Sequence, residues 1–340
     1  MGPRRLVVLA PNWLGDAVMA LPALADVRRH FADAHLTVAG RGAVASLFGM
    51  VRGVDAVLAL PGRGGMAAWR TWKDDVSTLA AGGFDMALLF PNSFASAFVT
   101  SRAGIGERWG LATDMRGRLL TRAAPRPRSA GHQSAYYQAL VSAFGISNGP
   151  AYAEVDPPAL DPGLAPAGRY VVFAPGAAYG TAKQWPPVRF AELAGDLLGA
   201  GLGVVLVGSR GDQRACAEIA AGARASRRGA VDPPLTDLSG HTTLEQLAWL
   251  MARAGAVVSN DSGAMHLAGA VGAPVVAVFG ATNEHRTSPL TRGPDRPPPV
   301  VVSTNVWCRP CMLRECPIDH RCMTRISARQ VHDAVRTVAR

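Results

Sequence analysis

The stretch 257–280 constrains the fold most, because it alternates two apolar segments with a polar loop and a helical pattern. A β-branched apolar segment leads into the loop Asp261-Ser262-Gly263, which is followed by a predicted helix (264–271) and a second apolar strand (274–280). Strand, loop, helix and strand in this order form a βαβ unit, and such units build parallel sheets. The sequence therefore predicts an α/β fold.

The polar loop of this unit lies where the helix is predicted to begin. Backbone N–H groups and the positive end of the helix dipole point outward there, so the loop can hold an anion. Gly263 would let the backbone approach a ligand closely. Because a carboxylate repels phosphate, we expect Asp261 to cap the helix or to accept hydrogen bonds from sugar hydroxyls. An ordinary helix cap explains Asp261 and Ser262 equally well.

The charge balance points to an anionic partner. The net charge of the 340 residues is +10, and almost all of the positive charge is arginine, since Lys73 and Lys183 are the only lysines. This length suits two domains. No apolar run approaches the roughly 20 residues of a membrane span, and segment 6–10 is too short for a signal peptide. We therefore expect a cytoplasmic protein.

Apolar segments that end in polar loops recur through the first half of the chain. The predicted strands are 6–10, 36–39, 57–60 and 86–90, and the predicted helices are 17–31, 76–81 and 132–144. Asp16 closes the loop after the first strand, at the strand end where open α/β sheets bind ligands. It is either a general base or merely the cap of the next helix. The loop 61–65 is long enough to cover a substrate.

Seven arginines gather between residues 101 and 128, accompanied by only Glu107 and Asp114 as acidic residues. Arginine grips phosphates and carboxylates with two parallel hydrogen bonds, so this stretch is either an acceptor site or a solvated surface. It has no interleaved aromatic residues and no helix-turn-helix pattern, which argues against nucleic acid as a partner. The arginines are Arg102, Arg108, Arg116, Arg118, Arg122, Arg126 and Arg128.

The second half repeats the pattern with strands at 170–174 and 204–207 and helices at 188–198, 244–252 and 327–338. The loop 175–186 carries Lys183 between a strand and a helix, which is typical of a phosphate site, although the Walker run Gly-Lys-Ser/Thr is missing. Asp212 either accepts both hydroxyls of a ribose or caps a helix. Thr242 or Thr243 caps the helix that follows them.

The two βα series predict two Rossmann-like domains that face each other across a cleft. The first domain covers residues 1–150, and the segment 151–168, rich in Pro, Ala and Asp, is the linker. The second domain covers residues 169–326. The final helix, within 327–340, could pack back on the first domain.

Four of the five cysteines lie close together in the sequence: Cys308, Cys311, Cys316 and Cys322, with His320 between the last two. Four soft ligands within fifteen residues suit tetrahedral zinc, and a reducing cytoplasm disfavours disulfides. The spacing is not that of a zinc ribbon. The alternatives to a bound metal are therefore a disulfide or free thiols in a structured loop. We expect a structural role in either case.

Four motifs in one order carry a resemblance to a known family. They are Pro11-Asn12-Trp13-Leu14-Gly15-Asp16-Ala17-Val18-Met19, Pro91-Asn92-Ser93-Phe94, the run from Pro175-Gly176-Ala177 to Lys183-Gln184-Trp185-Pro186, and Asn260-Asp261-Ser262-Gly263-Ala264-Met265-His266. Between about Leu6 and Pro289 the chain resembles the ADP-heptose:lipopolysaccharide heptosyltransferases of glycosyltransferase family 9. Some members share a similar Cys-rich segment and others lack it.

The resemblance implies a GT-B fold, in which the N-terminal domain binds the acceptor and the C-terminal domain binds ADP-heptose. It implies an inverting transfer of L-glycero-D-manno-heptose that needs no cofactor or catalytic metal. The acceptor would be heptosyl-Kdo₂-lipid A, the phosphorylated inner core of lipopolysaccharide. The enzyme would work in the cytoplasm, at the surface of the inner membrane.

The resemblance also assigns roles. Asp16 matches the catalytic aspartate, which would take the proton of the acceptor hydroxyl. Lys183 and the backbone N–H groups of Ser262 and Gly263 would meet the charge on the departing ADP. The remaining contacts would be Asp261 with the heptose hydroxyls, His266 near the diphosphate, Asp212 with the nucleotide, Thr242 and Thr243 with adenosine, and the Arg102–Arg128 stretch with the acceptor.

Two alternatives stay open at this point. One is a family 9 transferase with another donor or acceptor, and the other is a non-catalytic protein that binds nucleotides or glycans on the same scaffold. A nucleotide-sugar epimerase is disfavoured, because no Gly-x-Gly-x-x-Gly follows the first strand.

Overall fold

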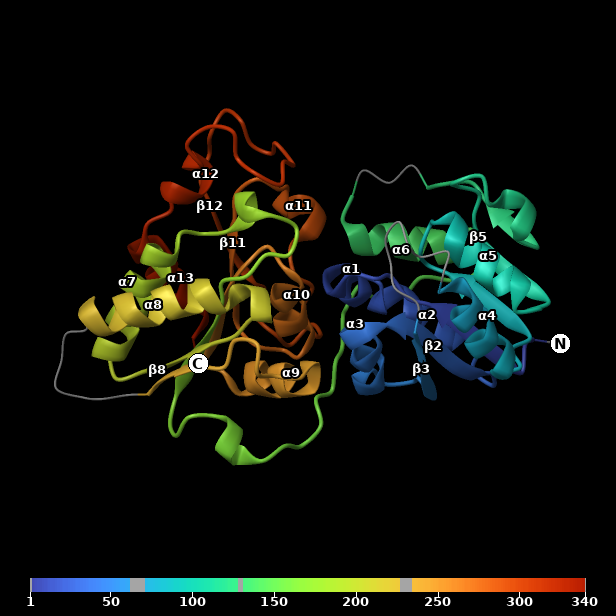
Figure 1. Cartoon of the computed structure of the whole chain (residues 1–340), viewed down its shortest axis with the longest axis horizontal. Helices are drawn as coiled ribbons and strands as arrows, with labels where there is room; N and C mark the ends of the chain where they lie inside the picture. The colour runs from blue at the N-terminus through green and yellow to red at the C-terminus, as the bar shows by residue number, and fades with distance from the viewer. Residues whose placement is uncertain (1, 62–70, 128–130, 227–233, 340) are drawn as a thin grey trace. The chain divides into compact units, whose positions relative to one another are not determined.

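The computed structural model describes residues 2–61, 71–127, 131–226 and 234–339 (Figure 1). The chain forms two compact units, Met1–Tyr152 and Ala153–Arg340, which we call unit 1 and unit 2. Of the expected substrate-covering loop, only Pro61 belongs to the described residues, and Arg128 also lies outside them. In the described ranges no helix combines the length and the apolar character that a membrane span requires.

Unit 1 is built on a parallel sheet whose described part has six strands in the order β3-β2-β1-β4-β5-β6. The strands are β1 (Arg5–Leu9), β2 (His35–Arg41), β3 (Ala56–Leu60), β4 (Met86–Leu89), β5 (Glu107–Leu111) and β6 (Arg122–Ala124). The central strands β1 and β4 pair in register from Leu6 with Met86 to Leu9 with Leu89. These continuous apolar runs are buried on both faces, as parallel strands usually are.

The helices of unit 1 flank this sheet (Figure 1). They are α1 (Leu14–Met19), α2 (Leu21–His30), α3 (Gly42–Leu47), α4 (Trp72–Ala81), α5 (Phe94–Arg102) and α6 (Gln133–Ser142). The single helix predicted at 17–31 is in fact two helices that meet at Ala20. Pro22 lies at the start of α2 and has no N–H to continue the hydrogen-bond ladder of α1.

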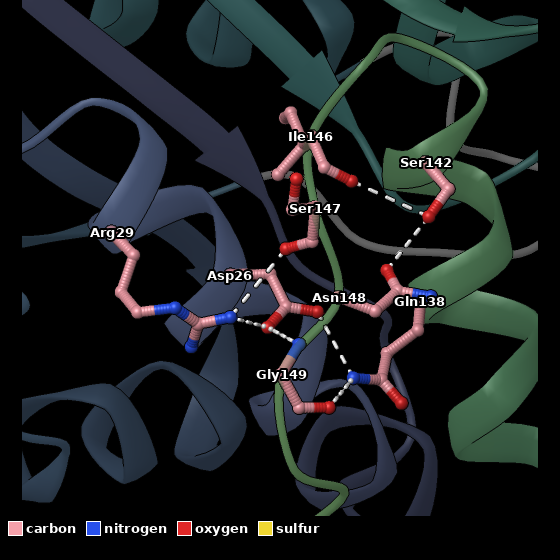
Figure 2. Close-up of polar contacts among 8 residues, drawn as sticks. All are labelled: Asp26, Arg29, Gln138, Ser142, Ile146, Ser147, Asn148 and Gly149. Atoms are coloured by element: carbon pink, nitrogen blue, oxygen red, sulfur yellow. Dashed lines mark hydrogen bonds and ion pairs between the residues drawn. The ribbon is translucent and has the colours of Figure 1, made fainter.

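A buried carboxylate ties α2 to α6 and to the end of unit 1 (Figure 2). Asp26 is 1% exposed and accepts hydrogen bonds from the Gly149 backbone N–H at 2.9 Å and from Gln138 Nε2 at 3.0 Å. Arg29 on the next turn forms an ion pair with it at 2.5 Å. Gln138 Nε2 also donates to the Gly149 carbonyl at 3.0 Å. The N–H and the carbonyl of Gly149 are therefore both hydrogen-bonded to this network.

Unit 2 repeats the architecture with a second parallel sheet, whose described strands run β12-β11-β10-β7-β8-β9. They are β7 (Tyr170–Ala174), β8 (Gly203–Leu206), β9 (Leu235–Asp237), β10 (Ala256–Asn260), β11 (Val275–Phe279) and β12 (Val300–Ser303). The helices are α7 (Pro187–Gly199), α8 (Gln213–Ser226), α9 (Leu244–Arg253), α10 (Gly263–Ala270), α11 (Glu284–Thr287), α12 (Arg321–Thr324) and α13 (Ala328–Val338). Helices α7, α8 and α13 cover one face of the sheet, and α9 and α10 lie on the other (Figure 1).

The C-terminal helix and the linker from Ala153 onward belong to unit 2. Val331, Val335 and Val338 of α13 are buried in the same apolar cluster as α7 and the sheet. The apolar side of α13 therefore packs within unit 2. The start of the linker is also held there, because Ala153 and Val155 donate backbone hydrogen bonds to Thr291 and Ala270.

Both sheets have the same topology, which confirms the prediction of two Rossmann-like domains with parallel sheets. In each unit the chain builds outward from a first strand and then returns to the other side of it. The neighbouring strands β1 and β4, and likewise β7 and β10, therefore send their following loops in opposite directions. Open α/β sheets bind ligands at such switch points. Every motif named above follows one of these four strands or ends one of them.

The Asp26 network generates a stability prediction. We expect Asp26→Asn to lower the free energy of unfolding by about 2–4 kcal/mol, because the amide keeps the shape but removes the charge that the buried donors require. Urea unfolding of the full chain measures the change. The matched control is Asp33→Asn, an exposed residue whose replacement should change stability by less than about 0.5 kcal/mol. Equal effects of the two substitutions would contradict the prediction.

Candidate functional site

The loops after β7 and β10 are joined by Asn260, the last residue of β10. Its side chain is completely buried. Oδ1 accepts from the Trp185 backbone N–H at 3.0 Å, and Nδ2 donates to the Pro175 carbonyl at 2.6 Å. Both ends of the loop 175–186 are therefore fixed to the end of β10. The sequence analysis assigned no role to Asn260, although its position at the end of an apolar strand was the available signal.

This arrangement brings Lys183 to Asp261. Their side chains form an ion pair at 2.7 Å and are only 14% and 4% exposed. Thr282 Oγ1 donates to the same oxygen of Asp261 at 2.6 Å. Asp261 therefore does turn away from the helix start, but it does so to bind Lys183 and not to cap α10. Such a desolvated pair holds the ammonium group in one place.

The first turn of α10 lies next to this ion pair. The helix begins at Gly263, one residue before its predicted start, and its N-cap Ser262 makes no side-chain capping hydrogen bond. The hydroxyl of Ser262 instead meets that of Ser259 at 3.2 Å. The positive end of the helix dipole is thus close to the ammonium of Lys183, which makes this edge suitable for an anion. His266, one turn further along α10, is buried with 3% of its surface exposed.

Two other predicted contacts have local structural tasks. Asp212 Oδ2 accepts from the backbone N–H and the hydroxyl of Ser209, at 2.8 and 2.7 Å, in a capping box that precedes α8. It also lies beside the loop after β7, since a Cβ added to Gly176 would come within 2.5 Å of its carboxylate. Thr243, not Thr242, caps α9, and Gln246 completes that capping box. The predicted nucleotide contacts of these residues remain predictions.

The first switch point, in unit 1, carries Asp16 in the first turn of α1. The N-cap of α1 is Trp13, so Asp16 is not the cap. Asp16 is partly exposed, and Tyr137 of α6 lies within its electrostatic reach. Burial, and then the negative charge of Asp16, raise the pKa of Tyr137 well above its ordinary value. This phenol therefore stays neutral and protonated at physiological pH.

The loop after β4 is organised by a buried arginine, a role that neither alternative for this stretch, acceptor site or solvated surface, had predicted. Arg116 has no exposed surface. Its Nε donates to the Leu111 carbonyl at 2.9 Å, and its other nitrogens donate to Ser96 Oγ at 2.9 Å and to the Pro91 carbonyl. Burial lowers the pKa of its guanidinium to about 10, so it remains a cation at neutral pH. Nothing in the sequence distinguishes Arg116 from its neighbours.

The remaining arginines do not act as one continuous site. Arg108 donates to the Leu119 carbonyl at 2.8 Å, and the guanidinium of Arg122 lies 4.5 Å from the Trp109 ring, so these contacts stabilise β5 and β6. These two residues and the buried Arg116 therefore contribute to the fold, and the acceptor contacts expected along the stretch remain predictions. Arg102 and Arg118 are exposed, and so is Arg126, whose guanidinium lies 6.0 Å from the Tyr136 ring.

The cysteine segment encloses a cavity but does not assemble a metal site. Cys308, Cys311, Cys316 and Cys322 all line one cavity, and none of them is in a disulfide. Within the described parts of the chain, no three His, Cys, Asp or Glu side chains are placed to hold a metal ion. The expected structural zinc is therefore not supported. Backbone hydrogen bonds to the loops around Ala182 and Ala281 hold the segment instead.

The comparisons with known proteins agree with this geometry. Residues 76–321 match the family model described as glycosyltransferase family 9 (heptosyltransferase). Lipopolysaccharide heptosyltransferase 2 of Salmonella typhimurium is 30% identical over 305 residues, which cover 84% of this chain and 86% of that protein. The structure of an E. coli ADP-heptose lipopolysaccharide heptosyltransferase II superposes with a TM-score of 0.80 at 26% identity, covering 98% of each chain.

A second E. coli heptosyltransferase, solved with ADP, shares the fold with a TM-score of 0.73 at 18% identity, over 98% of this chain and all of that one. These likenesses confirm the predicted GT-B fold. Together with the family match, which spans well over half of the chain, they establish its membership: the protein is an enzyme of glycosyltransferase family 9, the heptosyltransferase family.

Proposed function

We propose that the protein transfers L-glycero-D-manno-heptose from ADP-heptose to heptosyl-Kdo₂-lipid A, the reaction of a heptosyltransferase II. The observation that carries the proposal is the meeting of Lys183, Asp261 and the start of α10 at the switch point of unit 2. A cation and a helix N-terminus side by side suit a diphosphate. The relatives named lipopolysaccharide heptosyltransferase 2 support this choice of donor and acceptor.

On the donor side, the bond between the anomeric carbon and the β-phosphate oxygen breaks, and negative charge grows on the departing ADP. Lys183 and the N–H groups at the start of α10 would stabilise that charge without moving far, because the ammonium is already held in place. The contacts from Lys183 and Thr282 both use Oδ2 of Asp261. Its Oδ1 is therefore the oxygen that we assign to a heptose hydroxyl.

On the acceptor side, Asp16 would remove the proton from the attacking hydroxyl as its oxygen forms the new bond to the anomeric carbon. Attack from the face opposite ADP inverts that carbon, so a single displacement needs one base. The neighbouring Tyr137 stays neutral, as its raised pKa requires, and does not compete with Asp16 for the proton. The exposed Arg102, Arg118 and Arg126 are candidates for contacts with acceptor phosphates at the inner membrane.

A release assay tests the proposed reaction. The protein is mixed with ADP-heptose and heptosyl-Kdo₂-lipid A, and free ADP and the extended glycolipid are measured. We expect both to appear in equal amounts, and UDP- and GDP-sugars to give neither. If ADP is released with a different acceptor but not with heptosyl-Kdo₂-lipid A, the protein is a family 9 transferase with another acceptor specificity. A protein that binds ADP-heptose but never releases ADP would be a non-catalytic binding protein.

The role of Asp16 is tested by Asp16→Asn, which keeps the size of the side chain but cannot accept the proton. We expect turnover to fall about 10²–10⁴-fold while the affinity for ADP is unchanged, because the base acts only in the chemical step. Steady-state kinetics and calorimetric titration with ADP measure the two quantities. Asp33→Asn serves as the control, and unchanged turnover in Asp16→Asn would remove Asp16 from the mechanism.

Lys183→Gln should lower kcat much more than it lowers ADP affinity, because the ammonium is expected to stabilise charge that develops as ADP leaves. Removing one charge of a buried pair also costs about 3–5 kcal/mol of stability. The double variant Lys183→Gln, Asp261→Asn removes both charges, and we expect it to regain much of that stability without regaining turnover. A weakened ADP affinity with normal kcat would show that Lys183 merely binds the nucleotide.

A further inference from the structure

The cysteine-rich segment 308–322 is bonded directly to the loop that carries Lys183. The Ala182 backbone N–H donates to the Arg314 carbonyl at 2.9 Å, and the Ala182 carbonyl lies 3.0 Å from His320 Nε2. The Tyr179 hydroxyl donates to the Met312 carbonyl at 2.8 Å. Both peptide groups of Ala182 are therefore held by the segment, one residue before Lys183.

The two pieces of chain pass each other closely. A Cβ added to Gly180 would lie 2.2 Å from the Arg314 carbonyl oxygen, so no side chain fits at that position. Ala182 is 1% exposed and lines the same cavity as the four thiols. The contact is therefore a packed one and does not rest on an isolated hydrogen bond at the surface.

The other end of the segment is bonded to the loop that supports Asp261. The Met312 backbone N–H donates to the Ala281 carbonyl at 2.9 Å. Arg309 donates from Nε to the Gly280 carbonyl at 2.7 Å, and its Nη2 pairs with Glu284 Oε2 at 2.6 Å. Thr282, within this loop, donates to Asp261. The segment thus connects the supports of both members of the Lys183–Asp261 pair, and the ion pair closes the ring.

We propose that the segment 308–322 braces the donor site and that His320 is a positioning residue for Lys183. This rests on the proposed function of Lys183 in the departure of ADP. A carbonyl oxygen only accepts, so Nε2 of His320 carries the hydrogen that holds the Ala182 carbonyl. Without that hydrogen bond the peptide between Ala182 and Lys183 can rotate, which moves the origin of the lysine side chain. Misplacement by about 1 Å can cost a reaction about 100-fold in rate.

The pair His320→Gln and His320→Asn tests the proposal. The amide nitrogen of glutamine reaches about as far as Nε2 of histidine, whereas that of asparagine reaches only as far as Nδ1. The backbone of His320 has a φ of 55°, a left-handed conformation that asparagine adopts readily. Local backbone preference therefore favours His320→Asn, while the hydrogen bond to Ala182 is available only to His320→Gln. Comparing the two variants therefore separates the effect of the hydrogen bond to Ala182 from an effect on folding.

The kinetic result expected for His320→Asn is a kcat about 10-fold lower, with little change in the KM for ADP-heptose or in Tm. His320→Gln should retain most of the wild-type kcat. In a Lys183→Gln background, His320→Asn should cause no further loss, because its effect passes through Lys183. A loss that adds to that of Lys183→Gln, or wild-type kcat in His320→Asn, would overturn the proposal.

Hydrogen–deuterium exchange supplies a readout that does not depend on the reaction. The amides of residues 180–184 should exchange about 10-fold faster in His320→Asn than in the wild type, and at the wild-type rate in His320→Gln. Equal exchange in all three proteins would overturn the positioning role. If the wild type releases no ADP from ADP-heptose, the proposed function fails, while the exchange rates still decide whether His320 holds the loop.

Discussion

The proposed donor site depends first on the buried amide of Asn260. A primary amide enclosed by protein must satisfy both its oxygen and its nitrogen, and here the partners are the two ends of one loop. Because Trp185 is only two residues from Lys183, fixing the Trp185 backbone also limits where the lysine can lie. The ion pair with Asp261 then selects one position within that limit. The neutral amide of Asn260 thus positions the loop that carries the charged side chain of Lys183.

Both units use the same sheet topology, but they place different chemistry at their switch points. Unit 2 presents a cation and a helix N-terminus, which suit a departing diphosphate. Unit 1 presents Asp16 near Tyr137. Burial raises the pKa of the Tyr137 phenol, which therefore stays neutral. The buried guanidinium of Arg116 faces backbone carbonyls and holds the neighbouring loop, so its charge serves the architecture. One scaffold therefore carries the proposed proton acceptor in one unit and the proposed anion site in the other.

The cysteine-rich segment shows how a sequence pattern can point to the wrong physical role. Four thiols at short spacing suggested metal coordination, yet the contacts that define the segment are made by its backbone and by Arg309 and His320. Small side chains such as cysteine allow the segment to pack closely against Ala182 and Ala281. Under this interpretation, the spacing of the cysteines reflects the path of a loop that contacts both the loop after β7 and the loop after β11.

The sequence by itself determined the elements with strong apolar periodicity and the loops between them. It placed Asp16, Lys183 and Asp261 correctly at strand ends, because buried parallel strands are continuous apolar runs. It missed β5, β6, β9 and β12. Strands β6 and β9 have only three residues each, and β5 begins with the charged residues Glu107 and Arg108. Only the tertiary structure decided that Arg116 is buried, that Asp261 binds Lys183, and that His320 reaches Ala182 across 138 residues of sequence. Such contacts depend on how distant elements pack, and local patterns carry no record of that packing.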